Sequence, residues 1–233
     1  MQDKLEKPFI SWWKKWLSHL TALPVEKHSS EYNPDLQVVI ARGKHQLLCG
    51  KAIYSFDVHY DNFATIFARL NWDKIHLQQG LLLGLGLASI PVIIEEKHRI
   101  TAGYTAVDID PVVVDLARKY TIPYLKSHVD IFTADAADFV KTCTRKFDFI
   151  FIDLFVELDV PMKFMHHNFI SRLAGLLTPQ GVILQNCVGF DDQEIKHTTL
   201  YFEQVFKKQF THAEMIPISG NMMLFSDRRV MLK

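Results

Sequence analysis

The sequence predicts an α/β protein with a doubly wound, Rossmann-like and mostly parallel seven-stranded sheet, a C-terminal antiparallel hairpin and a small N-terminal β-hairpin and helix subregion. Two observations lead to this prediction. From Leu81 onwards, short apolar segments alternate with helical stretches, which is the pattern of a parallel sheet covered by helices on both faces. Near the end, two apolar segments flank a short loop with proline and glycine, which is typical of an antiparallel hairpin.

The composition favours a globular enzyme or binding domain. The chain has 233 residues, of which 48% are hydrophobic, so it can bury one sizeable core. Its 26 basic and 26 acidic side chains cancel, and we expect no nucleic-acid partner. The three cysteines are far apart without a CxxC pair and the histidines form no HExxH motif, so we expect no metal site and a reducing, cytoplasmic location.

The first part of the chain predicts an amphipathic helix rather than a membrane anchor. Residues 4–20 lack the apolar stretch of a signal peptide, and no later apolar run reaches the roughly 18 residues needed to span a bilayer. Trp12, Trp13 and Trp16 fall on one side of the predicted helix, with Lys14 and Lys15 opposite. We expect this helix to pack on the domain or on a partner subunit, without stable membrane association, and the tryptophans make a homodimer plausible.

Two strands and a helix are predicted next, at residues 36–40, 46–53 and 61–70, with a turn at 41–44. We therefore divide the chain into an N-terminal helix and β-hairpin subregion, residues 1–75, and a larger second part, residues 76–233. In the second part, strands are expected at 80–83, 103–107, 129–133, 147–152 and 182–185, and a terminal hairpin at 212–216 and 222–225. Helices are expected at 88–97, 111–120, 136–142, 162–177 and 192–209.

A glycine-bearing turn follows the first strand of the predicted parallel sheet. Gly84 and Gly86 stand between the apolar strand and the next helix, where residues without a Cβ let the backbone turn tightly and approach a ligand. The turn alone is only a weak indication of a ligand site, because two glycines can simply satisfy the geometry of a strand-to-helix connection.

Carboxylates follow the next strands at the same edge of the sheet. Asp108 comes 24 positions after Gly84, where this architecture offers acceptors to a ribose diol, whereas Asp110 fits best as a helix cap. Asp135 and Asp153 end the third and fourth strands. Because ligands of open α/β sheets bind outside the carboxyl ends of the strands, we expect these groups to converge on one crevice, with independent helix caps as the alternative.

These motifs together resemble the spermidine synthase-like branch of the class I S-adenosylmethionine-dependent methyltransferase superfamily. The resemblance runs from about residue 81 to 186, and the N-terminal hairpin also looks like the β region that polyamine synthases place before this core. It implies that residues 76–233 form a class I methyltransferase-like nucleoside-binding domain. It further implies roles for the cofactor-binding residues. Gly84 and Gly86 would face the methionine part of the cofactor, Asp108 would hold the ribose hydroxyls, and Asp135 would accept a hydrogen bond from the adenine amino group. Ile109 and Ala136 would flank the adenine ring, and Asp153, at the end of the fourth strand, belongs to the same cofactor-binding set.

Two positions depart from the resembling family. Its polyamine-forming members carry an acid within the glycine loop and a second acid three residues after the fourth-strand aspartate, and this chain has Leu87 and Val156 there. Both amine-handling acids are thus missing, and because aminopropyl transfer needs a general base near a neutral amine, their absence argues against a polyamine synthase. Glu157 or Asp159 could substitute, although surface loop acids are the commoner explanation.

We therefore expect an S-adenosyl-L-methionine-dependent methyltransferase that acts on an unidentified small-molecule acceptor, with Asp153 as the candidate catalytic residue. The alternatives are an aminopropyltransferase (polyamine synthase), a non-catalytic S-adenosylmethionine-binding module, and a dinucleotide oxidoreductase, against which Ser89 counts because a glycine or alanine is wanted there. The acceptor-side candidates are Asp153, Phe155, Asn186, Tyr54, Phe56, His59 and Tyr60.

Overall fold

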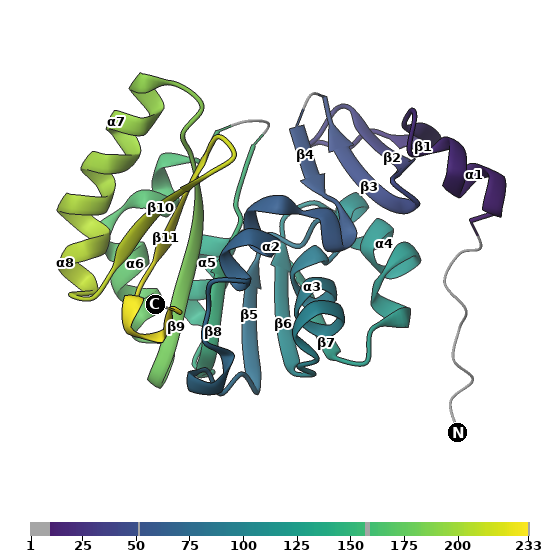
Figure 1. Cartoon of the computed structure of the whole chain (residues 1–233). Helices are drawn as coiled ribbons and strands as arrows, with labels where there is room; N and C mark the ends of the chain where they lie inside the picture. The colour runs from purple at the N-terminus through teal and green to yellow at the C-terminus, as the bar shows by residue number, and fades with distance from the viewer. Residues whose placement is uncertain (1–9, 51, 157–158, 233) are drawn as a thin grey trace.

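The computed structural model describes residues 10–50, 52–156 and 159–232. Within these residues the chain forms a four-stranded and a seven-stranded sheet. Figure 1 shows the small sheet at the upper right, above the half of the large sheet that contains β6 and β7, and the hairpin β10–β11 at the opposite edge. The predicted α/β architecture with a mostly parallel seven-stranded sheet and a C-terminal hairpin is confirmed.

The small sheet is an antiparallel meander in the order β1-β2-β3-β4. A short helix, α1 (Trp12–Leu17), precedes it, and its strands are β1 (Leu23–His28), β2 (Leu36–Ala41), β3 (Lys44–Cys49) and β4 (Ala52–Ser55). The single strand predicted at 46–53 is wrong, because Gly50 adopts a φ of 55° and the chain turns back there. Strand β1 was not predicted, since it carries Pro24 and several polar side chains and is an edge strand with an irregular register.

A core of apolar side chains joins the small sheet to the large one. Leu36, Val38 and Leu47 pack with Leu87 and with residues of the helix α4 (Pro111–Tyr120). After β4, the helix α2 (Asp61–Phe67) contributes Phe63, Ile66 and Phe67 to the main core, all fully buried. The small sheet is therefore held over one end of the large sheet.

The large sheet has the strand order β10-β11-β9-β8-β5-β6-β7. Strands β5 to β9 run parallel to their neighbours, whereas β11 pairs antiparallel with both β9 and β10. The strands are β5 (Gln79–Leu83), β6 (Gly103–Asp108), β7 (His128–Thr133), β8 (Phe147–Ile152), β9 (Leu177–Val188), β10 (Glu214–Ile218) and β11 (Asn221–Phe225).

Both faces of this sheet are buried because alternate residues of a strand point to opposite faces. Leu82 and Phe151 join a core under α2, α3 (Ser89–His98) and α4. Leu81, Leu83 and Ile150 join the second core, on the other face. The helices that cover this second face are α5 (Ala136–Thr142), α6 (His167–Ala174) and α7 (Asp192–Tyr201).

Two predicted helices differ from those observed. The helix predicted at 162–177 is wrong, because a 3₁₀ turn (Met162–Met165) comes first, His166 is extended, and Leu177 already pairs with Phe147 in the sheet. The helix predicted at 192–209 is continuous but contains a π-helical stretch (Phe202–Phe206) between α7 and α8 (Lys207–Gln209). Over the described residues, no helix has both the length and the apolar character needed to cross a membrane.

Candidate functional site

A cavity of about 720 Å³ lies between the small sheet and the carboxyl ends of β5, β6 and β8. The structure brings every residue predicted for cofactor binding to its wall, together with the acceptor-side candidates. The predicted cofactor-binding residues that line it are Gly84, Gly86, Asp108, Ile109, Asp135, Ala136 and Asp153. The acceptor-side candidates that line it are Tyr54, Phe56, His59, Tyr60, Phe155 and Asn186.

Two positions of the glycine loop, 84 and 86, are packed so tightly that only glycine fits there. Gly84 has a φ of 89°, and a Cβ there would stand 2.1 Å from the backbone oxygen of Asp153. Gly86 has a φ of 52°, and its Cβ would stand 2.9 Å from the backbone oxygen of Tyr54. The loop thus touches both β4 and the end of β8, and its exposed backbone forms one wall of the cavity.

Asp108 ends β6 and is fixed by backbone donors. Its two carboxylate oxygens accept hydrogen bonds from the N–H groups of Leu85, at 2.9 Å, and Asp110, at 3.0 Å. Burial raises the pKa of Asp108, and these two hydrogen bonds oppose the rise. Each oxygen can accept a further bond, so the carboxylate keeps acceptor capacity. Its role as ribose acceptor remains a prediction.

Asp110 is the helix cap that the sequence predicts. It is fully buried, and its carboxylate accepts a hydrogen bond from the N–H of Val112 in the first turn of α4, at 2.8 Å. The side chains of Ser30 and Asn33 also donate to it. Asp110 therefore ties the segment before β2 to the core, and its capping role is confirmed.

Asp135 caps the helix α5 and lies in the cavity wall. Its carboxylate accepts a hydrogen bond from the N–H of Ala137, at 2.8 Å, and pairs with the ammonium of Lys163. Burial by itself would raise the pKa of Asp135, but the bonds from Lys163 and Ala137 outweigh it and hold the pKa below its usual range. Lys163 was not predicted, because no spacing rule connects it to Asp135.

Asp153 follows β8 and is held by side chains. The hydroxyl of Tyr60 donates to one carboxylate oxygen at 2.9 Å, and the amide of Asn186 donates to the other at 3.0 Å. Asn186 in turn accepts a hydrogen bond from the amide of Asn221, at 2.9 Å. Burial raises the pKa of Asp153 to about 6, although the bonds from Asn186 and Tyr60 lower it, and the charge of Asp108 adds to the rise. A carboxylate with this pKa can accept a proton near neutral pH.

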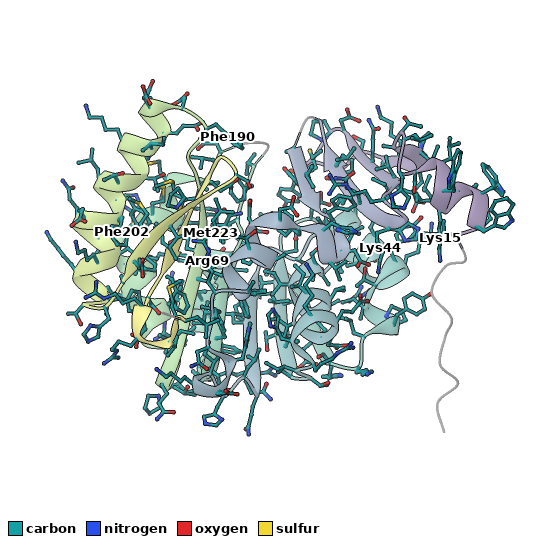
Figure 2. The ribbon with its side chains drawn as sticks, in the orientation of Figure 1. Lys15, Lys44, Arg69, Phe190, Phe202 and Met223 are labelled. Carbon is teal, nitrogen blue, oxygen red and sulfur yellow. The ribbon has the colours of Figure 1, made fainter. Side chains whose placement is uncertain are left out.

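The mouth of the cavity beside Asp153 is formed partly by residues that the sequence analysis missed. Phe190 lies near the tip of the hairpin β10–β11 in Figure 2, where its ring packs against Gly220. Asn221 also lines the cavity and is 7% exposed. An asparagine next to a glycine turn is a common turn residue, so the sequence offered no clear signal for a role in the site.

The two positions that depart from the resembling family occupy different environments. Leu87 is 2% exposed and packs between the small sheet and α4, so its side chain lies in the core. Val156 is 56% exposed and lines the cavity. Of the two substitute acids considered, Asp159 is exposed and accepts a bond from the N–H of Val160, and Glu157 lies outside the described residues.

The geometry of the described residues offers no metal centre, since no three of their His, Cys, Asp or Glu side chains are grouped to hold an ion. The cysteines Cys49, Cys143 and Cys187 are buried and unpaired.

Comparison with known proteins identifies relatives of this arrangement. A family model described as the spermine/spermidine synthase domain matches residues 95–228. A polyamine aminopropyltransferase of Vibrio vulnificus is 28% identical over 150 residues, which cover 63% of this chain and 49% of that protein. The chain spans about half the length of the curated relatives that it matches.

Solved structures agree on the fold. A spermidine synthase in complex with the transition-state analogue AdoDATO superimposes with a TM-score of 0.68 at 15% identity, over 89% of this chain and 74% of that one. Human methyltransferase-like protein 13 in complex with SAH superimposes with a TM-score of 0.59 at 21% identity, over 74% of this chain and 85% of that one. The fold is thus shared by a spermidine synthase and a methyltransferase-like protein. The curated relatives are named polyamine aminopropyltransferases, which favours the alternative function over a methyltransferase.

Proposed function

Since the chain belongs to the spermine/spermidine synthase domain family, we propose that it is an aminopropyltransferase that uses decarboxylated S-adenosylmethionine as donor and an amine as acceptor. The observation that carries this proposal is Asp153, a carboxylate in the cavity wall whose pKa is raised to about 6. The names of the curated relatives support the same activity.

Asp153 has the properties of a general base for an amine nucleophile. An alkylammonium has a pKa near that of lysine, about 10.4, so it must lose a proton before its nitrogen can attack. Above about pH 6, Asp153 is ionised, attracts the ammonium and can take that proton. When bound, the sulfonium donor supplies an activated carbon, so that a C–N bond forms while the C–S bond breaks and sulfur keeps the electron pair.

The neighbours of Asp153 suit this role. Burial raises the pKa of Tyr60 well above its usual value, so its hydroxyl stays protonated and donates to the carboxylate throughout the working pH range. Asn186 can only donate to an ionised carboxylate through its amide nitrogen. Both donors leave lone pairs of Asp153 for an incoming N–H, because each carboxylate oxygen accepts more than one bond.

The residues along the rest of the cavity fit a nucleoside donor. We assign Asp108 to the ribose hydroxyls, Asp135 to the adenine amino group, and Ile109 and Ala136 to the faces of the ring. Gly84 and Gly86 line the cavity with backbone atoms, because they have no side chain, so the aminopropyl tail can approach the backbone of this loop. We call this part of the cavity the nucleoside end, and the part around Asp153, Tyr60 and Asn186 the acceptor end.

The departures at Leu87 and Val156 then concern the anchoring of the acceptor rather than the base. Leu87 packs in the core, so it does not shape the acceptor end directly. Val156 replaces an acid at the mouth, which leaves Asp153 as the proton acceptor but removes one anionic contact for a second ammonium. The proposal therefore covers transfer to an amine without assigning a particular one.

Product analysis tests this function. The protein is incubated with decarboxylated S-adenosylmethionine and each of a set of amines (putrescine, cadaverine, agmatine and spermidine), and products are identified by mass spectrometry. We expect an aminopropylated amine with at least one acceptor. A parallel set contains S-adenosylmethionine instead. Methylated products there, with no aminopropylated product in the first set, would contradict the proposal and support the methyltransferase hypothesis.

A further inference from the structure

We propose that Asn221, on the C-terminal hairpin, positions the general base Asp153 by fixing the orientation of the Asn186 amide that stands between them. This inference rests on the proposed function, because it assigns Asp153 as the base. Three hydrogen bonds form one connected chain: Asn221 Nδ2 to Asn186 Oδ1 at 2.9 Å, Asn186 Nδ2 to Asp153 Oδ1 at 3.0 Å, and Tyr60 Oη to Asp153 Oδ2 at 2.9 Å.

The donor-to-acceptor direction of these hydrogen bonds is set by the carboxylate of Asp153, where they end. An ionised carboxylate accepts hydrogen bonds and cannot donate them, so Asn186 must turn its NH₂ group toward Asp153. Its carbonyl oxygen then points away, and Asn186 is only 1% exposed, so that oxygen needs a donor within the protein. The NH₂ group of Asn221 is that donor. A rotated Asn186 would lose this bond and place its oxygen against the carboxylate.

The hairpin register brings the two amides together. Asn186 of β9 stands opposite Met223 of β11, and Asn221 lies two residues before Met223 on the same strand. Residues two apart share a face of a strand, so Asn221 is the diagonal neighbour of Asn186. The turn between β10 and β11 consists of Ser219 and Gly220, with φ values of 50° and 83°. A two-residue turn of this kind fixes the register, and a slip of one residue would move Asn221 to the other face.

The orientation of Asn186 affects the pKa of Asp153 because few other groups stabilise the ionised carboxylate. Among the described residues, the titratable groups that act on it are Tyr60, at the start of α2, and Asp108, at the end of β6. Tyr60 donates a hydrogen bond, whereas Asp108 repels the charge. Without Asn221, the oxygen of Asn186 loses its donor, so the orientation with NH₂ toward the carboxylate is stabilised less, and the protonated form of Asp153 gains relative to the ionised form.

Two variants test this role. Asn221→Ala removes the donor, and Asn221→Asp keeps the shape but presents a carboxylate to the oxygen of Asn186. The control is Met223→Leu, a fully buried residue of the same strand outside the hydrogen-bond chain. The pKa of Asp153 is measured in each full-length protein by ¹³C NMR titration of the side-chain carboxyls, with the resonance assigned from Asp153→Asn.

We expect the pKa of Asp153 to rise by about one unit in Asn221→Ala and by more in Asn221→Asp, and to stay within about 0.3 units in Met223→Leu. If one variant does not fold, the other decides. An unchanged pKa in a folded Asn221 variant, or an equal rise in Met223→Leu, would overturn the inference.

The pH dependence of aminopropyl transfer gives a second readout. At pH 6 the Asn221 variants should be roughly 3- to 10-fold slower than the unaltered protein, and the rates should converge near pH 8.5, where Asp153 is ionised in all of them. A merely structural defect would lower the rate at every pH. If no amine is aminopropylated but the NMR shift is found, the proposed function fails and the positioning role of Asn221 stands. If transfer is found without an NMR shift, the proposed function stands and the positioning role fails.

Discussion

The two ends of the cavity fix their carboxylates in different ways. At the nucleoside end, Asp108 accepts hydrogen bonds from the backbone N–H groups of Leu85 and Asp110. At the acceptor end, Asp153 is held by the side chains of Tyr60 and Asn186, which lie 93 and 33 positions away in the chain. A backbone donor is placed by the fold, whereas a side-chain donor disappears with one substitution. The nucleoside end should therefore tolerate changes in neighbouring side chains better than the acceptor end does.

The largest expected effect is that of Asp153→Asn on catalysis. The amide has the shape of the carboxylate but cannot take a proton from the acceptor amine, and a general base contributes about 10²- to 10⁴-fold to the rate. We expect the single-turnover rate of aminopropyl transfer to fall by that factor. The affinity for the nucleoside donor, measured by calorimetry, should change by less than about threefold, because the nucleoside end is unaltered.

The matched control for this substitution is Asp159→Asn, six positions further along the chain. Asp159 is exposed, and its carboxylate accepts a hydrogen bond from the N–H of Val160. Its amide variant should keep the transfer rate. A large loss of rate in Asp159→Asn, with Asp153→Asn still active, would mean that the loop acid is the base and that the acceptor end has been assigned to the wrong carboxylate.

A smaller effect is expected for Asp108→Ala at the nucleoside end. Hydrogen bonds to a charged group are worth about 1.5–3 kcal/mol each, so loss of the carboxylate should weaken donor binding by about tenfold or more. The comparison variant is Asp110→Ala, which removes a fully buried cap that also binds Ser30 and Asn33. It should mainly lower the melting temperature. If calorimetry instead shows that Asp110 controls affinity, the ribose has been assigned to the wrong residue.

The contrast between the two ends also explains what could be predicted from the sequence. The glycine turn and the acids after β6, β7 and β8 are local features, since each lies where a strand gives way to the next turn. Their convergence follows from the parallel sheet alone. Gly84, Asp108 and Asp135 were therefore assignable to one crevice from the sequence, and the cap formed by Asp110 was assignable from its place before Pro111.

The partners of Asp153 could not be assigned in the same way. Tyr60 and Asn186 were candidates for the acceptor side, but their bonds to Asp153 depend on how α2 and β9 pack against β8. Asn221 depends on the register of the terminal hairpin. In the fold, β1 was not predicted for a related reason, because an edge strand with Pro24 and three consecutive polar side chains lacks the apolar signal of a buried strand.

The smallest expected effect is that of Lys163→Met on stability and donor affinity. This variant is also the sharpest test of the contrast between the nucleoside end and the acceptor end. Lys163 is the side chain that pairs with a nucleoside-end acid, Asp135, which also accepts a backbone bond from Ala137. The ammonium side chain is 52% exposed, and exposed ion pairs contribute about 0–1 kcal/mol, so solvent screening should keep the loss of stability at pH 7 below about 1 kcal/mol. The melting temperature should fall by less than about 4 °C, and donor affinity should stay within about threefold because the backbone bond to Asp135 remains.

The pH dependence of the stability loss in Lys163→Met tests whether the loss comes from the ion pair with Asp135. A carboxyl whose pKa is lowered in the folded state stabilises the fold above the unfolded-state pKa, and this contribution is lost as the pH falls through the folded-state pKa. The pKa of Asp135 is lowered, so the difference in stability between Lys163→Met and the unaltered protein should be present at pH 7 and shrink as the pH falls below the usual aspartate pKa of about 3.9. Lys207→Met, which removes an exposed pair with Glu203 far along the chain in α8, is the control for a generic loss of charge. A tenfold loss of donor affinity in Lys163→Met but not in Lys207→Met would show that the nucleoside end also depends on a side-chain partner, and the contrast between the two ends would no longer hold.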